Sequence, residues 1–268
     1  MPFTQWRSGA EFTRSQKTSS YTPLFLALGV VLLAPPRAHA MHLAEGILPL
    51  NWAAFWTLAT VPFIAAALVL LRRRDIEDPF YKPFVAMVAA AVFVVSCMPV
   101  PVPTAGTCSH PCGTGLAAIL IGPWMTILVT FVVLLLQALF LAHGGLTTLG
   151  ADIVSMGIAG GFTGYFVFRA CRRFNVPIWA AAFAAGLLSD WATYATTSAE
   201  LASALHGEAA FTSVFVTVLL AFVPTQVPLG ILEGFVTAGA LAFLAKRRID
   251  ILERLKVCAP LRPLVEAV

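Results

Sequence analysis

Six long apolar stretches dominate the pattern of hydrophobic and polar positions, and short polar segments separate them. They cover about residues 52–71, 84–100, 116–141, 151–168, 177–199 and 211–245. A helix needs about 20 apolar residues to cross the hydrocarbon core of a bilayer, and most of these stretches have that length. The pattern therefore predicts an all-α integral membrane protein.

The first forty residues have a different pattern, typical of a secretory presequence. Arg14 and Lys17 precede an apolar run over residues 24–34, and Ala38-His39-Ala40 is a small-x-small cleavage site. We interpret residues 1–40 as a cleavable signal peptide. An uncleaved signal anchor is the alternative, whereas a translation start at Met41 would leave the same mature end.

Basic clusters indicate how the apolar stretches cross the membrane, because Lys and Arg are enriched in cytoplasmic loops. The clusters are Arg72-Arg73-Arg74 with Lys82, Arg169 with Arg172-Arg173, and Lys246-Arg247-Arg248 with the basic residues that follow. All three can be cytoplasmic only if residues 113–141 form two arms. Gly122-Pro123 is the natural break, since proline cannot continue a helix without losing a hydrogen bond.

This arrangement predicts seven transmembrane helices in the mature chain. Residues 41–248 form the polytopic domain and residues 249–268 a short cytoplasmic tail. The amino terminus is expected on the periplasmic side of the inner membrane, and the carboxyl terminus in the cytoplasm.

Composition supports the membrane class and excludes several functions. The chain is 59% hydrophobic and 11% charged, against roughly 25% charged residues in soluble domains. The net charge of +4 is small, and the basic residues sit in short clusters beside apolar runs, so we expect no nucleic-acid partner. The sequence contains neither a Walker motif nor HExxH. We therefore expect a protein that is not an enzyme and depends on separate subunits for any ATP hydrolysis.

Cleavage after Ala40 would create a compact metal chelator. The α-amine of Met41, the amide nitrogen of His42 and the His42 imidazole form fused chelate rings. A fourth nitrogen would complete a tetragonal set that suits Ni(II) or Cu(II) and can accept Co(II), whereas zinc prefers a tetrahedral site. His110 is the candidate for that fourth ligand, because the predicted topology places all mature histidines on the outer face.

Other polar residues leave alternatives open. Cys108 and Cys112 could form a disulfide, but their close spacing around Pro111 favours free thiols; ligation by Cys108 is a minor alternative. Ionisable groups inside apolar segments suggest a polar path or a helix–helix pair. We expect a helix–helix hydrogen bond for Gln137 and leave Asp190 and Glu233 undecided.

Three motifs in order resemble the CbiM family, the membrane subunits that bind cobalt in energy-coupling-factor transporters, which are related to the nickel NikM subunits. The resemblance covers about residues 41–245. The motifs are Met41-His42 with Glu45-Gly46 and Leu48-Pro49, Cys108-Ser109-His110-Pro111 with Gly113-Thr114-Gly115, and Gln137-Ala138-Leu139 leading to His143-Gly144-Gly145. Two positions depart from the family pattern, Cys112 for a threonine and Asp152 for an asparagine.

The resemblance implies six helices shared with vitamin-binding S components plus an extra amino-terminal helix. It implies import of Co(II) for cobalamin synthesis, with metal bound by Met41, His42 and His110. His143, Ser109 and Cys108 are candidates for orienting these ligands; for His143 a plain loop role was favoured. The implied partners are a transmembrane coupling subunit, two ATPase subunits and a small accessory membrane subunit. A nickel importer of the same class is the nearest alternative, and a self-sufficient secondary transporter is a more distant one.

Overall fold

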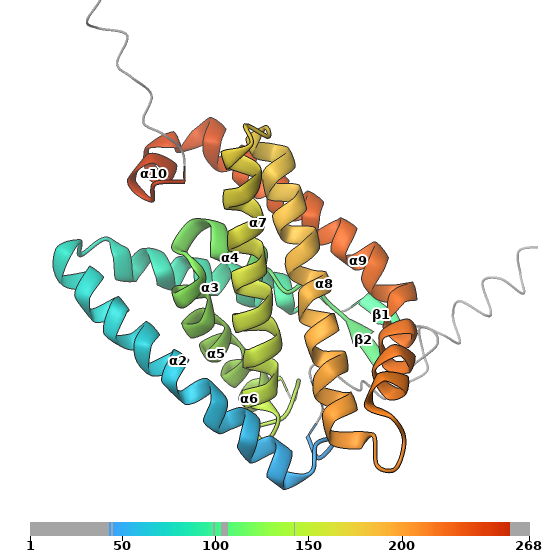
Figure 1. Cartoon of the computed structure of the whole chain (residues 1–268). Helices are drawn as coiled ribbons and strands as arrows, with labels where there is room; N and C mark the ends of the chain where they lie inside the picture. Colours follow the sequence, from blue (N-terminus) through green and yellow to red (C-terminus); the bar gives the residue numbers. More distant parts are fainter. Residues whose placement is uncertain (1–42, 44, 99, 103–106, 142, 258–268) are drawn as a thin grey trace, which may run out of the picture. The chain divides into compact units, whose positions relative to one another are not determined.

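The computed structural model describes residues 43, 45–98, 100–102, 107–141 and 143–257. The predicted signal peptide, Met41, His42 and the last part of the predicted tail lie outside the described residues. Helices dominate the described chain, with one short two-stranded ribbon (Figure 1). The elements are α2 (Leu50–Glu77), α3 (Tyr81–Ser96), β1 (Val100–Val102), β2 (Thr107–Ser109), α4 (Thr114–Ile121), α5 (Pro123–Phe140), α6 (Leu149–Asp152), the π-helical segment η1 (Ile153–Gly160), α7 (Gly161–Arg173), α8 (Ile178–Leu205), α9 (Phe211–Arg247) and α10 (Ile249–Arg254).

The predicted break at Gly122-Pro123 is confirmed. α4 ends at Ile121, Gly122 has a φ of 81°, and Pro123 begins α5. Proline is well suited to the first turn of a helix, where its missing N–H has no intrahelical partner. Two helices of unequal length, 8 and 18 residues, therefore replace the single apolar stretch.

The prediction of a helix throughout the apolar stretch at 84–100 is wrong at its end. α3 ends at Ser96, and Val100–Val102 pairs antiparallel with Thr107–Ser109. Prolines alternate with apolar residues from Pro99 to Pro103, and proline inside a helix removes a hydrogen bond and clashes with the preceding turn. The sequence therefore leaves the helix and forms a ribbon just before His110.

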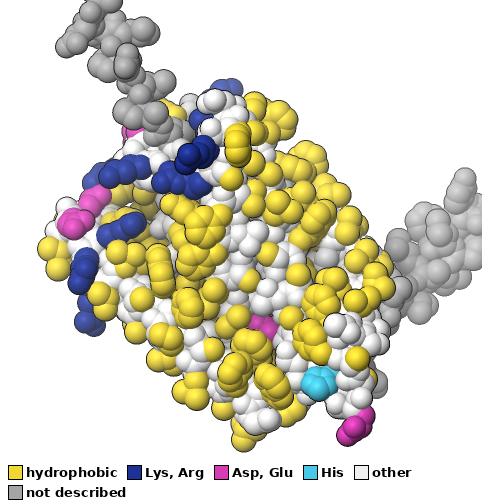
Figure 2. Space-filling view, viewed as in Figure 1, with side chains coloured by type: hydrophobic (Ala, Val, Ile, Leu, Met, Phe, Trp, Pro, Cys, Tyr) yellow, Lys and Arg dark blue, Asp and Glu magenta, His cyan; other side chains and the backbone are white. Residues whose placement is uncertain are grey.

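In the described part of the chain, four helical segments are long and apolar enough to cross a membrane: α2, α5, the continuous α6–η1–α7 segment over Leu149–Arg173, and α9. α3 is apolar but shorter. Many large apolar side chains of α2 and α9 are exposed, as expected for surfaces that face lipid. Yellow apolar side chains accordingly cover much of the face in Figure 2. α8, 28 residues long, is not among the four, since polar residues such as Ser189 and Asp190 are buried within it.

Basic side chains gather at one end of the visible face, near the carboxyl ends of α2, α7 and α9 (Figure 2). Arg74, Arg169 and Arg254 line one hollow of about 520 Å³ at this end. The three basic clusters that we assigned to one side of the membrane therefore meet in the structure.

α8 packs most extensively against α9, and small residues allow this close approach. A Cβ atom on Gly186 would lie 2.6 Å from Thr237 Oγ1 and 2.9 Å from the Glu233 carbonyl oxygen. The backbone oxygen cannot move without moving α9. Gly186 thus sets the distance between the two helices.

We expect Gly186→Ala to lower the free energy of unfolding by about 1–3 kcal/mol, the usual cost of overpacking a core. Gly239→Ala in α9 is the matched control, because nothing lies within 4 Å of the added Cβ. It should be neutral or slightly stabilising, since alanine favours a helix over glycine by about 1 kcal/mol. Thermal unfolding of both variants in detergent tests this, and equal melting temperatures would contradict the close α8–α9 contact.

Candidate metal centre

His110 is buried between the ribbon and α4. It is 1% exposed, and its Nδ1 lies 3.1 Å from the Pro111 carbonyl oxygen. The His143 ring packs against it, with ring centroids 5.1 Å apart. Two histidines from loops distant in sequence therefore meet. Sequence reasoning favoured a plain loop role for His143, whereas the structure places it beside the candidate ligand.

Both imidazoles lie in loops outside the helices, and burial affects their protonation. Desolvation lowers the pKa of His110 to about 4 and also lowers the pKa of His143. A neutral imidazole keeps a lone pair, which a metal ligand requires. The environment of His110 therefore favours its ligand form at neutral pH.

The segment that follows Met41-His42 is anchored near these histidines. The Leu43 amide donates to Asp152 Oδ1 at 3.0 Å, and the Thr148 hydroxyl donates to the Leu43 carbonyl. Glu45 Oε2 accepts a bond from the Thr147 amide at 3.3 Å. Leu43 itself is 3% exposed, within a small apolar cluster. We call the described residues 43 and 45–49 the arm; their hydrogen bonds fix it to the loop before α6 and to α6 itself.

Asp152 connects the arm to His110. Its side chain and that of His110 line the same small cavity, about 10 Å³ in volume. The other lining residues are Cys112, Ser155, Met156, Thr193, Tyr194 and Thr197. Two of these belong to η1, in keeping with the frequent placement of π-helical segments at functional sites. The amide that follows His42 is thus bonded to a carboxylate of the His110 cavity.

Sequence reasoning missed the role of the buried acids near the arm. Asp152 attracted notice only as a departure from the family pattern, and Glu200 was not singled out. Glu200 is 1% exposed, and neither of its carboxylate oxygens has a hydrogen-bond partner among the described residues. It interacts electrostatically with Asp152. The signal was present in the sequence, because an ionisable residue in a membrane segment suggests function by default.

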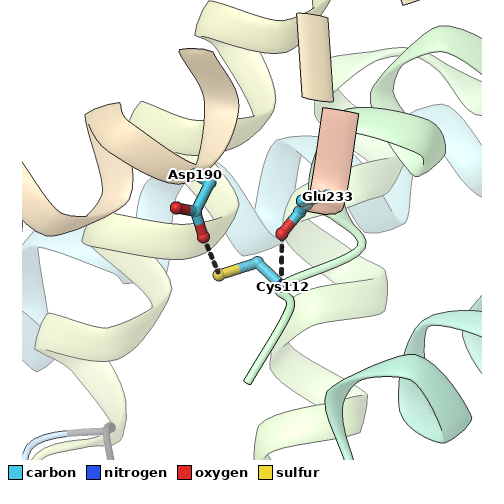
Figure 3. Close-up of side chains that lie close together, drawn as sticks. All are labelled: Cys112, Asp190 and Glu233. Atoms are coloured by element: carbon cyan, nitrogen blue, oxygen red, sulfur yellow. Dashed lines mark hydrogen bonds between the residues drawn. The ribbon is translucent and has the colours of Figure 1, made fainter. Parts of the chain in front are cut away.

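Glu233 holds the loop that carries His110. Its Oε2 accepts from the Cys112 amide at 2.7 Å, and its Oε1 accepts from the Gly113 amide at 2.9 Å. The Cys112 thiol points at Asp190 Oδ1, 3.9 Å away (Figure 3). A carboxylate that accepts two backbone N–H groups fixes that backbone firmly. Helix α9 therefore positions the segment that begins at His110.

Several predicted residues can now be placed. Cys112 is a free thiol, as we favoured over a disulfide. Gln137 Nε2 donates to Ser96 Oγ at 2.8 Å, which confirms the expected helix–helix hydrogen bond. Cys108 and Ser109 belong to β2, but their side chains lie outside what the structure describes. Met41 and His42 are also outside it, so their contact with His110 stays a prediction.

Comparisons with known proteins agree with the resemblance. Residues 42–251 match the family model CbiM, "Cobalt uptake substrate-specific transmembrane region". A relative from Sorangium cellulosum, "Cobalt transport protein CbiM", is 70% identical over 217 residues, which cover 81% of this chain and 96% of that one. A relative of the same name from Geobacter sulfurreducens is 56% identical, covering 86% of this chain and 66% of that one.

A solved structure, "Crystal Structure of an transition metal transporter", has a similar fold. Its TM-score is 0.68 at 24% identity, covering 81% of this chain and the whole of the other. A truncated transition metal transporter gives a TM-score of 0.65, also at 24% identity, covering 77% of this chain and 99% of the other. At this identity the likeness concerns the fold alone. The family match over most of the chain and the two close relatives identify this protein as a member of the CbiM family.

Proposed function

We propose that this chain is the substrate-specific component of an ATP-driven energy-coupling-factor transporter that imports cobalt for cobalamin synthesis. It binds Co(II) through the free Met41 amine, His42 and His110. The observation that carries the proposal is the bond between the Leu43 amide and Asp152, a carboxylate of the His110 cavity.

The covalent geometry of the chain supports this ligand set. Consecutive Cα atoms lie about 3.8 Å apart, so His42, which directly precedes Leu43, is only one peptide away from the residue that bonds to Asp152. The His42 imidazole and the Met41 amine, on the two residues before Leu43, are therefore proposed to reach the same cavity. The buried Glu200 carboxylate interacts with Asp152 and has no hydrogen-bond partner in the described part of the chain, so it offers charge compensation for a terminal amine or a cation.

Cobalt is proposed because the two relatives that match most of this chain are both named cobalt transport proteins. Chelate geometry alone accommodates nickel as well. Cobalt uptake by cells that express the chain with its partner subunits, measured with and without competing Ni(II), separates the two. Preferential nickel uptake would refute the proposed cobalt preference.

We propose seven crossings, made by α2, α3, α4, α5, α6–η1–α7, α8 and α9. Because α4 has only 8 residues, its crossing is completed by the loop before it, which dips into the membrane where protein surrounds it. The common location of Arg74, Arg169 and Arg254 at one end supports a cytoplasmic assignment for that end. The mature amino terminus and the His110 cavity then face the periplasm. The protein works in the inner membrane with a coupling subunit, two ATPase subunits and a small accessory subunit.

An apolar groove of about 510 Å³ between α3 and α5 offers a docking surface for the coupling subunit. Small residues of α3, among them Ala86 and Ala90, line it, and small residues let a second helix approach closely. Uptake that requires the coupling and ATPase genes would support this assembly. Full uptake by the chain alone would favour a secondary transporter instead.

Gly145→Ala is expected to weaken cobalt binding by displacing the arm. A Cβ atom on Gly145 would lie 2.8 Å from both the Cα and the amide nitrogen of Glu45, so the backbone of the arm must shift. Changes that reposition metal ligands typically cost about 10–100-fold in affinity. Isothermal titration with Co(II) measures this effect.

Leu146→Ala provides the control for this prediction, because its side chain is 53% exposed in the same loop. It should bind cobalt as the unmodified protein does. Equal affinity of the Gly145 and Leu146 variants would show that the arm does not set the metal site.

A further inference from the structure

A second group of potential metal ligands lies close to the His110 loop. One ligand atom each of Cys112, Asp190 and Glu233 lies within 4.8 Å of the others. The side chains come from the loop before α4, from α8 and from α9, and they converge in Figure 3. Their exposed fractions are 1%, 0% and 1%.

The charges of this group need compensation. Two carboxylates share one buried site, and the ion pairs found in the described part of the chain all involve other residues. A buried charge is costly unless it is paired, protonated or bound to a metal. Backbone amides satisfy Glu233 in part, whereas Asp190 Oδ2 has no hydrogen-bond partner among the residues that the structure describes. The two carboxyl groups also interact with each other. The site therefore requires a proton or a cation.

We infer that Cys112, Asp190 and Glu233 form a second binding site for the transported divalent cation, a transit site on its way into the protein. The inference rests on the proposed function, since it assumes that the chain carries Co(II). A thiolate and two carboxylates supply a mixed soft and hard ligand set that Co(II) accepts. Binding releases the thiol proton and any proton held by the two carboxyl groups, so the cation replaces them.

The location fits a transit role. Cys112 lines the cavity that His110 also lines, and it follows His110 by two residues. Asp190 and Glu233 lie within α8 and α9, away from the ends of both helices. Transport through a membrane protein is favoured by several sites of moderate strength, because a single tight site retains its ion. The proposed nitrogen site at His110, followed by the site of Cys112, Asp190 and Glu233, would provide two such binding sites in series.

The competing explanation is a proton shared by Asp190 and Glu233, with Cys112 merely packed beside them. The two differ in one observable property: a thiolate bound to Co(II) produces a near-ultraviolet charge-transfer band, which a shared proton does not. Co(II) alone is therefore the probe. It is added in excess to the purified full-length mature chain and to its His110→Ala variant, in which the first site is disabled.

We expect the charge-transfer band in both proteins. Cys112→Ser should abolish the band. Asp190→Asn should weaken the affinity for Co(II), measured from the band, by at least about tenfold, because even indirect changes to a metal site cost about that much. Cys171→Ser, another free thiol, in α7, is the matched control and should retain the band. Because Cys108 lies only four residues before Cys112 in the sequence, the Cys108→Ser variant must retain the band too.

Absence of the band in both starting proteins overturns the inference, whatever the variants do. The inference is also overturned if the band persists in the Cys112→Ser variant, or if only the Cys108→Ser variant loses it. These failures are distinct from failure of the proposed function. If cobalt binds tightly, depends on His110 and shows no sulfur band, the proposed function stands and the transit site is refuted.

Discussion

His110→Ala is expected to reduce cobalt uptake to the background of cells that lack the chain. His110 is fully enclosed, and burial keeps its imidazole neutral and ready to ligate. Its replacement removes one of the proposed nitrogen ligands and leaves the Asp152 side of the cavity unchanged. We expect the affinity of the purified protein for Co(II) to fall more than tenfold, and the helical fold to be retained.

Two histidine variants complete this experiment. His206 directly follows α8, so the His206→Ala variant should transport cobalt normally. His143→Ala removes the ring beside His110 and should weaken binding about 10–100-fold, as expected for a residue that orients a ligand. Normal uptake by a well-folded His110→Ala protein would exclude His110 as a ligand.

Insertion of one alanine between Met41 and His42 is expected to abolish tight cobalt binding as completely as loss of His110. The insertion keeps the amine, the histidine and every described contact of the arm. It moves the histidine to the third position, which enlarges the chelate and displaces the amine from the cavity that Asp152 lines. Cobalt content after extensive dialysis measures the effect.

Met41→Ala is the matched control for the insertion. It changes the first side chain but keeps a free amine directly before His42, so the fused rings can still form. We expect cobalt content equal to that of the unmodified chain. An insertion variant that retains its cobalt would contradict the proposed placement of the amine and of a second-position histidine at the His110 cavity.

Local sequence signals predicted much of the fold. The Gly122-Pro123 break was predictable because proline acts on the helix that contains it. The apolar stretches located most helices, yet the helix end at Ser96 was missed. Just after Ser96, prolines alternate with apolar residues from Pro99 to Pro103, and this pattern permits a strand but no helix.

The candidate site was predictable only in part. Residue types and charge clusters placed His110 and the arm on one side of the membrane. The bond between Leu43 and Asp152 joins residues 109 positions apart, and no local pattern encodes such a contact. The same applies to Glu233, which supports the loop after His110 from 120 positions away. From the sequence, Asp152 could be noted only as a departure from the family pattern, and Glu233 only as an ionisable group inside an apolar segment.

The central claim is that cleavage creates the metal ligand, and mass analysis of the purified protein's amino terminus together with its cobalt content tests it most directly. We predict a chain that begins at Met41 and holds tightly bound cobalt. A chain that begins at Met1 and binds one equivalent of cobalt just as tightly would contradict the account.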